Sequence, residues 1–310
     1  MQYFKNIIFI FILLNTFQAL SKNNFNIHPI EVSKNIYVFM GDNNDANPKN
    51  GGAISNTAFI IGTKSILVID AGPSYLYGSK VIEIIKSYSS LPIRYLVVTH
   101  HHPDHSFGLS RFIENGTKII MAQSEINRYV KYGNRLLKQL KNIIGEDWFI
   151  DTKIVAFKNK NIKFPINVNL GGREIIIELY DQGHSEGDLI VKDILSKTIF
   201  VGDLVFNERA PTIPHANINN WNKYISTIMD SNWDYLVPGH GKLIKEKEEL
   251  LLTKYWINYI DKIAKKAAKN GMSPAEIFNK GIPEPLLKYK LAKETWIRDL
   301  PLLINKYEFE

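Results

Sequence analysis

The segment His100–His105 (HHHPDH) constrains this chain more than any other, because it places four histidines and an aspartate within six residues. It directly follows Ile93–Thr99 (IRYLVVT), an apolar run that predicts a buried β-strand. Loops at strand ends commonly carry functional side chains. The whole chain of 310 residues has only eight histidines, so this concentration indicates a binding site.

The absence of cysteine limits what that site can be. A chain without cysteine has no disulfide, no cysteine nucleophile and no sulfur ligand. Any metal site must therefore be built from histidine, aspartate and glutamate.

Three further candidate ligands lie beside glycines near predicted strand ends, in Gly183–Ser185 (GHS), Gly202–Leu204 (GDL) and Pro238–Gly241 (PGHG). Together with the histidine-rich segment they make seven nitrogen or oxygen ligands: His100, His102, Asp104, His105, His184, Asp203 and His240. Such a set suits Zn²⁺, and also iron or manganese. Two four-coordinate ions would need eight protein bonds, and seven residues supply them if one carboxylate bridges. Asp203 is the natural bridge in a two-metal site about 3.5–4 Å across.

The rest of the chain predicts an α+β fold in two strand-rich halves with helices outside. Apolar residues make up 45% and charged residues 22%, which is ordinary for a folded globular protein. Predicted strands include Asn35–Met40, Thr57–Gly62, Ser65–Asp70, Ile166–Leu170, Glu174–Tyr180, Thr198–Asp203 and Tyr235–Val237; predicted helices include Gly78–Tyr88, Phe107–Glu114, Ser124–Ile144 and Asn219–Asp230. From Lys245 onward the pattern is helical, with a capping box at Ser273–Glu276.

The first 21 residues predict a signal peptide. Lys5 is followed by the apolar run Ile7–Leu14 and by small residues at Ala19 and Ser21. The apolar run is too short to span a bilayer, so we expect no stable membrane insertion after cleavage, although an uncleaved anchor is the alternative. The expected organisation is a signal peptide at 1–21, a catalytic domain at 22–243 and a helical C-terminal extension at 244–310. The expected location is periplasmic or secreted.

The ligand pattern resembles the metallo-β-lactamase superfamily, since H-x-H-x-D-H, the later single histidine, the aspartate after glycine and Pro-Gly-His-Gly occur in the family order. The resemblance covers roughly Ile36–Gly241. It implies an αβ/βα sandwich with metal ions at one edge, a first ion on His100, His102 and His184, and a second on Asp104, His105 and His240. Asp203 would lie between the ions. Asp70 matches the strand-end aspartate that orients ligands, so Asp70 and Asp104 are the expected catalytic residues.

The resemblance implies a binuclear zinc hydrolase in which a hydroxide bridging the two ions cleaves a lactam, lactone, ester or thioester. Asp203 makes the ligand set similar to that of glyoxalase II hydrolases, but Ser185-Glu186 departs from the Thr-Pro-Gly that follows the corresponding histidine there. The chain is most similar to exported zinc metallohydrolases linked to quinoprotein dehydrogenase systems. The segments that carry this weaker likeness are Leu91–Tyr95, Gly133–Gly145 and Gly171–Arg173.

Other functions remain open at this point. A persulfide dioxygenase shares the fold and uses one iron ion, and a nuclease of the superfamily would act on a phosphodiester. A non-catalytic binding module would have no use for seven ligands. The net charge of +7 is spread along the chain without a run of five like charges, so we expect a small-molecule acyl substrate rather than nucleic acid. The sequence does not define an oligomeric state.

Several residues near these motifs have competing interpretations. His101 alternates with two ligands, so we expect a structural role for it. His215 would either line the substrate gorge or have no role, and Asp188 would hydrogen-bond its loop. The polar loop Gly41–Gly52 is long for a plain hairpin and is expected to overhang the site, as in family members. The aromatic residues expected to pack in the core are Trp221, Tyr224 and Trp233.

Overall fold

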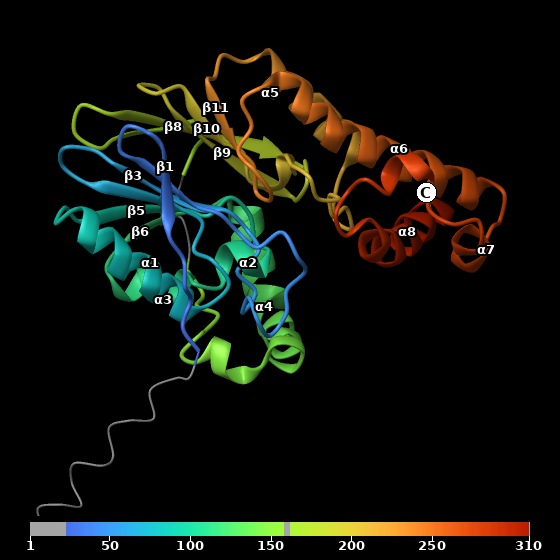
Figure 1. Ribbon diagram of the computed structural model, residues 1–310, viewed down its shortest axis with the longest axis horizontal. Helices are drawn as coiled ribbons and strands as arrows, with labels where there is room; N and C mark the ends of the chain where they lie inside the picture. The colour runs from blue at the N-terminus through green and yellow to red at the C-terminus, as the bar shows by residue number, and fades with distance from the viewer. Residues whose placement is uncertain (1–22, 158–161, 310) are drawn as a thin grey trace, which may run out of the picture.

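The computed structural model describes residues 23–157 and 162–309, so the predicted signal peptide lies outside the described residues. Two β-sheets face each other, and helices cover their outer faces (Figure 1). The expected α+β sandwich is therefore confirmed, together with a helical C-terminal region.

The first sheet has six strands in sequential order. They are β1 (Pro29–Ser33), β2 (Ile36–Phe39), β3 (Thr57–Ile61), β4 (Ile66–Ile69), β5 (Ile93–Val97) and β6 (Lys118–Ile120). Neighbours from β1 to β4 are antiparallel, and β4, β5 and β6 are parallel. The helices of this half are α1 (Tyr75–Tyr88), α2 (Pro103–Ser106), α3 (Leu109–Glu114), α4 (Gln123–Ile144) and the 3₁₀ turn η1 (Glu146–Phe149).

The second sheet has five strands in the order β11-β10-β9-β8-β7. They are β7 (Ile166–Asn169), β8 (Glu174–Asp181), β9 (Gly187–Asp193), β10 (Thr198–Phe200) and β11 (Tyr235–Val237). The helices are α5 (Ile218–Asp230), α6 (Leu250–Lys269), α7 (Pro274–Asn279) and α8 (Ala292–Glu308), with 3₁₀ turns η2 (Gly202–Leu204), η3 (Lys247–Glu249) and η4 (Glu284–Leu286). Only β10 and β11 pair in parallel.

Alternating side chains on the strands create separate hydrophobic layers. On β4, Leu67 and Ile69 face the second sheet, whereas Ile66 and Val68 face the helices of the first half. The same period of two brings Ile175 and Ile177 of β8 into the layer between the sheets. A third layer joins the outer face of the second sheet to α5, α6 and α8. The central strands are thus buried on both faces, whereas β1 and β7 at the sheet edges are partly exposed.

The structure differs from the sequence prediction in one additional strand and in the start of one helix. β1 was not predicted: Ile30 and Val32 alternate with polar residues, but the run is short, begins at Pro29 and contains no buried side chain. Helix α1 begins at Tyr75, earlier than predicted, since the Ser74 hydroxyl accepts a hydrogen bond from the Tyr77 amide. Trp221 and Trp233 are buried, as expected, and Tyr224 is partly buried.

The helical C-terminal region is packed against the second sheet. Trp256 of α6 and Trp296 of α8 belong to the same hydrophobic layer as Trp221 of α5. In Figure 1 these helices lie at one end of the sandwich. Within the described part of the chain, no helix is both long and apolar enough to cross a membrane.

Candidate metal centre

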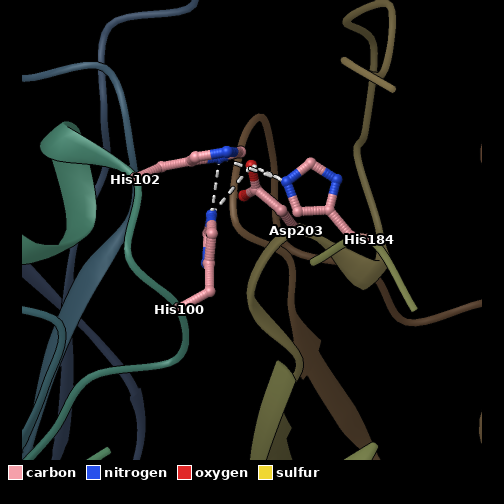
Figure 2. Close-up of side chains that lie close together, drawn as sticks. All are labelled: His100, His102, His184 and Asp203. Atoms are coloured by element: carbon pink, nitrogen blue, oxygen red, sulfur yellow. Dashed lines mark hydrogen bonds and ion pairs between the residues drawn. The ribbon is translucent and has the colours of Figure 1, made fainter. Parts of the chain in front are cut away.

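Three histidines and an aspartate converge at one edge of the sandwich. His102 Nδ1 lies 2.9 Å from His100 Nε2 and 3.2 Å from His184 Nε2. Asp203 Oδ2 lies 3.7 Å from His100 Nε2 and 3.5 Å from His184 Nε2. Figure 2 shows the four side chains pointing toward one another from loops of both halves of the molecule.

A second group adjoins the first through Asp203. Asp203 Oδ1 lies 3.2 Å from His105 Nε2 and 3.3 Å from His240 Nε2. Asp104 Oδ2 lies 3.5 Å from His105 Nε2 and 3.4 Å from His240 Nε2. The two oxygens of one carboxylate therefore face different donor groups. All seven sequence-predicted ligands are brought together in this way.

The separations fit the demands of a metal ion. Zinc–ligand bonds of about 2.0–2.1 Å in a tetrahedron place neighbouring donors about 3.3 Å apart. Both groups are close to that spacing. His105 Nε2 and Asp203 Oδ1 are buried and 3.2 Å apart, yet neither has a well-formed hydrogen bond. The two atoms are aimed at a common point rather than at each other, as ligands of one ion would be.

Hydrogen bonds behind the rings leave the inward nitrogens free. His105 Nδ1 lies 2.8 Å from Asp70 Oδ2, and His240 Nδ1 lies 2.8 Å from the Ile54 carbonyl oxygen. His100 Nδ1 lies 3.1 Å from the Thr99 hydroxyl. When Nδ1 donates to these oxygens, Nε2 of each ring keeps its lone pair toward the centre.

Asp70 is the hub of this supporting network. Its Oδ1 accepts a hydrogen bond of 2.7 Å from the Thr99 amide, and its Oδ2 faces His105. Its backbone has φ of 61°, a left-handed conformation that aspartate tolerates better than most residues. Asp70 contacts the outer nitrogen of the His105 ring but none of the converging donor atoms, which makes it a positioning residue. Its role in orienting ligands stays a prediction.

Glycine beside His240 is required by close packing. A Cβ at Gly239 would lie 2.0 Å from Asp203 Oδ1 and 2.7 Å from the Gly202 backbone. No larger residue fits there without moving the carboxylate. The two loops that carry Asp203 and His240 can therefore approach each other only through this glycine.

Burial and neighbouring charges shift the histidine pKa values of the two donor groups in opposite directions. Burial lowers the pKa of His100 and His102 well below the ordinary value, and it lowers the pKa of His184 to about 4. Burial acts in the same direction on His105, but three surrounding carboxylates outweigh it and raise its pKa well above the ordinary value. Burial opposes ionisation of Asp203, yet the surrounding imidazoles hold its pKa well below the usual range. At neutral pH and without a metal ion, these shifts favour neutral imidazoles in the first group and a protonated His105 in the second.

Arg209 was not predicted from the sequence as a site residue, and it is buried beside the second group. Its Nη1 lies 3.5 Å from His240 Nδ1 and 3.2 Å from the Asn44 carbonyl oxygen. Its Nη2 lies 3.8 Å from Asp45. Burial lowers the pKa of Arg209, while Asp104, Asp45 and Asp203 act to raise it. A lone arginine six residues after Asp203 gives no local sequence signal for this position.

The loop Gly41–Gly52 is attached to the rest of the molecule on two sides. Trp148 Nε1 donates to the Pro48 carbonyl oxygen at 3.1 Å, and Arg209 binds the loop near Asn44. Asn47 and Asn50 hydrogen-bond its own backbone. The loop is thus ordered next to His240, and its contact with substrate stays a prediction.

Three other polar residues considered in the sequence do not belong to the two donor groups. His101 is not one of the seven converging ligands, and its Nδ1 lies 2.5 Å from buried Glu125 Oε2. Asp188 binds the Ser185 amide and hydroxyl at 3.0 and 2.7 Å, which is the loop role expected for it, and burial raises its pKa to about 8. His28 contacts only Asn26, away from the site.

Comparison with known proteins identifies the family. The model of the metallo-beta-lactamase superfamily matches residues 50–257, and the chain belongs to this superfamily. Its members in the comparisons below are hydrolases by name, and the site described above is a possible metal site within that fold.

Individual relatives are distant. The chain is 22% identical over 241 residues to metallo-beta-lactamase IND-1 of Chryseobacterium indologenes, covering 74% of this chain and 88% of that protein. It is 24% identical over 215 residues to the human acyl-coenzyme A thioesterase MBLAC2, covering 60% and 72%. Among solved structures, a metallo-beta-lactamase from Pontibacter korlensis has a TM-score of 0.58 at 17% identity, covering 75% of this chain and 99% of that chain. One from Hirschia baltica has a TM-score of 0.57 at 18% identity, covering 74% and 97%.

Proposed function

We propose that this protein is an exported binuclear zinc hydrolase that cleaves an acyl bond in a small molecule. One observation carries the proposal: Asp203 directs one carboxylate oxygen to each of two donor groups, at 3.5 Å from His184 Nε2 and 3.3 Å from His240 Nε2. A mononuclear site has no need for such a shared carboxylate. Named relatives that act on a β-lactam and on an acyl-coenzyme A thioester support the acyl substrate class.

Each donor group would hold one ion. The first would lie on His100, His102 and His184, and the second on Asp104, His105 and His240, with Asp203 between them. Zinc ions in such sites lower the pKa of water to about 7 and polarise a carbonyl oxygen. Iron or manganese could use the same nitrogen and oxygen donors.

The protein's own residues account for proton handling and substrate orientation. The Asp104 side chain is 16% exposed, whereas that of Asp203 is 3% exposed. Asp104 can therefore reach solvent or a bound substrate and accept a proton from it, while buried Asp203 would serve only as a metal ligand. Arg209 lies between the Gly41–Gly52 loop and His240, where its positive charge would favour negative charge on a bound substrate.

Export is proposed from the sequence of residues 1–21 alone, with its single lysine and apolar run. A periplasmic or extracellular location would deliver the protein to small molecules outside the cytoplasm. Mass determination of the mature protein after expression with its own N-terminus would test cleavage after Ser21.

The catalytic proposal is tested with zinc-loaded protein and four acyl substrates: a chromogenic cephalosporin, an acyl-coenzyme A, a lactone and an aryl ester. We expect hydrolysis of at least one, lost on chelation and restored by zinc. Absence of hydrolysis of all four, with oxygen uptake by iron-loaded protein in the presence of a persulfide, would replace the hydrolase with a dioxygenase.

A further inference from the structure

A second histidine cluster lies on the far side of His102 from the proposed centre. His101, His102 and His215 each offer one ligand atom, and these three atoms lie within 4.8 Å of one another. The His215 ring centroid is 5.9 Å from that of each of the other two, whose centroids are 4.8 Å apart. The proposed function uses neither His101 nor His215.

Each of the three rings has a nitrogen available for a ligand. His102 turns Nδ1 toward His100 and His184, which leaves its Nε2 on the opposite side of the ring. His101 Nδ1 is occupied by Glu125, which leaves its Nε2. His215 is exposed, and within residues 23–157 and 162–309 it makes no hydrogen bond or ion pair.

Glu125 gives this cluster the support that metal-binding histidines usually have. It is fully buried, and its Oε2 lies 2.9 Å from the His101 amide and 2.5 Å from His101 Nδ1. A carboxylate behind an imidazole fixes the ring orientation and makes the outer nitrogen a better ligand. The nearby positive charge of Arg128 is paired with Glu186 at 2.9 Å. A surface histidine pair without this backing would lack such preorganisation.

We propose that His101, His102 and His215 form a third cation site, selective for transition metals that prefer imidazole, such as Zn²⁺, Ni²⁺ or Cu²⁺. The inference goes beyond the proposed hydrolase and does not require it. When both sites are filled, His102 binds one ion through each nitrogen as an imidazolate, and its remaining ring proton passes to solvent. His215, on the segment between η2 and α5, completes the site from the exposed side.

The test compares zinc binding by equilibrium dialysis in the wild type, His215→Ala and His28→Ala at matched free zinc. His28 is the control because it directly precedes β1, is not part of the cluster, and makes its one hydrogen bond among the described residues with Asn26. We expect His215→Ala to lose about one equivalent of weaker zinc, and His28→Ala to lose none. Equal binding by the wild type and His215→Ala would overturn the proposal.

A second comparison separates this site from the proposed binuclear centre. The zinc bound by Asp203→Asn and by Asp203→Asn/His215→Ala should still differ by about one equivalent per chain. This difference should not depend on how many tightly bound ions the proposed binuclear centre keeps. If the wild type binds no tight zinc but the difference made by His215→Ala persists, only the hydrolase proposal fails. If the tight ions remain and the difference vanishes, only the third site fails. Glu125→Gln should lower the affinity of the third site for zinc by about 10–100-fold. An unchanged affinity would show that Glu125 does not support the site.

Discussion

Asp203 directs Oδ2 toward His184 at 3.5 Å and Oδ1 toward His240 at 3.3 Å. Its side chain is buried, and its pKa is held low by the imidazoles around it despite that burial. An anionic group with two oxygens is the smallest side chain that can serve both donor groups. The binuclear account therefore depends on this residue more than on any one histidine.

Replacing Asp203 by asparagine should uncouple the two groups. The amide offers only one good metal ligand and no negative charge, so we expect zinc to fall from two ions to one per chain. We also expect hydrolytic kcat/KM to fall by about 100-fold or more, since removal of supporting groups alone typically costs 10–100-fold. Metal analysis and steady-state kinetics measure both effects.

Asp193→Asn is the matched control for that change. Asp193 is also buried, but it pairs with Arg173 at 2.8 Å on the second sheet. The control should lower stability and keep both zinc ions. Two tightly bound ions in Asp203→Asn would refute the bridging role.

The raised pKa of His105 predicts different pH behaviour for the two ions. Because its folded pKa is well above 6.5, His105 carries a proton at pH 7 that the second ion must displace. The first group has lowered pKa values and is already deprotonated. Affinity for the second ion should therefore rise about tenfold per pH unit until the pH reaches the His105 pKa, and affinity for the first ion should not change near pH 7.

Calorimetry in buffers of different ionisation enthalpy measures this effect as released protons. We expect about one proton from the second ion and almost none from the first at pH 7. His240→Ala, which removes a second-group donor, should abolish the proton-releasing phase. Equal proton release by both ions would show that the assigned charge states are wrong.

Among structural elements, the loops after strands position the donors. Gly239→Ala should damage the centre without removing a ligand, because the new Cβ would lie 2.0 Å from Asp203 Oδ1. We expect a loss of about 1–3 kcal/mol in the free energy of unfolding and loss of the second zinc. Thermal denaturation and metal analysis test this prediction.

Gly133→Ala is the control for a crowded glycine. Gly133 lies in the middle of α4, and the three atoms nearest to its added Cβ all belong to the Ile154 side chain, at 2.9–3.0 Å. The Ile154 side chain must shift, which costs some stability, but it carries no donor of the centre, and alanine favours the helix. Both zinc ions should remain. If Gly239→Ala also keeps both ions at wild-type affinity, the close approach of the two loops is not a requirement of the site.

The sequence could predict the donor set because the donors sit in short motifs at strand ends. In strands such as β4, side chains alternate between the two faces, so the apolar pattern identifies the strand and its end. Ile69 lies in the layer between the sheets, and Asp70 directly follows it at the strand end. Glu125 and Arg209 could not be found in this way. Glu125 lies on α4 and Arg209 on a loop, and each contacts residues that are distant in the sequence. Neither lies in a sequence motif that marks it.

At the level of the whole molecule, the C-terminal helices support the loops that carry the donors. Thr253 of α6 accepts a hydrogen bond from the Phe206 amide at 3.0 Å and donates to the Phe206 carbonyl at 2.9 Å. The Phe206 ring stacks on His240, with centroids 5.1 Å apart and planes 10° apart. Asp299 of α8 accepts from the Ile213 amide at 2.9 Å. The helical region therefore contributes to the site as well as to the core.

Thr253→Val should weaken both stability and the second zinc. Valine has nearly the same shape but leaves the buried Phe206 amide and carbonyl without partners, which costs about 1–3 kcal/mol. Thr227→Val is the control, because Thr227 is exposed on α5 and bonds only the Lys223 carbonyl; it should change stability by less than about 0.5 kcal/mol. If the two variants behave alike in denaturation and zinc binding, the helices do not support the site.

The most direct test of the binuclear account is the metal content of purified wild-type protein, measured together with hydrolysis of the four acyl substrates. A binuclear hydrolase would contain two tightly bound zinc ions per chain, besides any weaker zinc at the third site, and its hydrolysis would require both tight ions, of which one is left in Asp203→Asn. One iron ion per chain, with no acyl substrate cleaved, would contradict it.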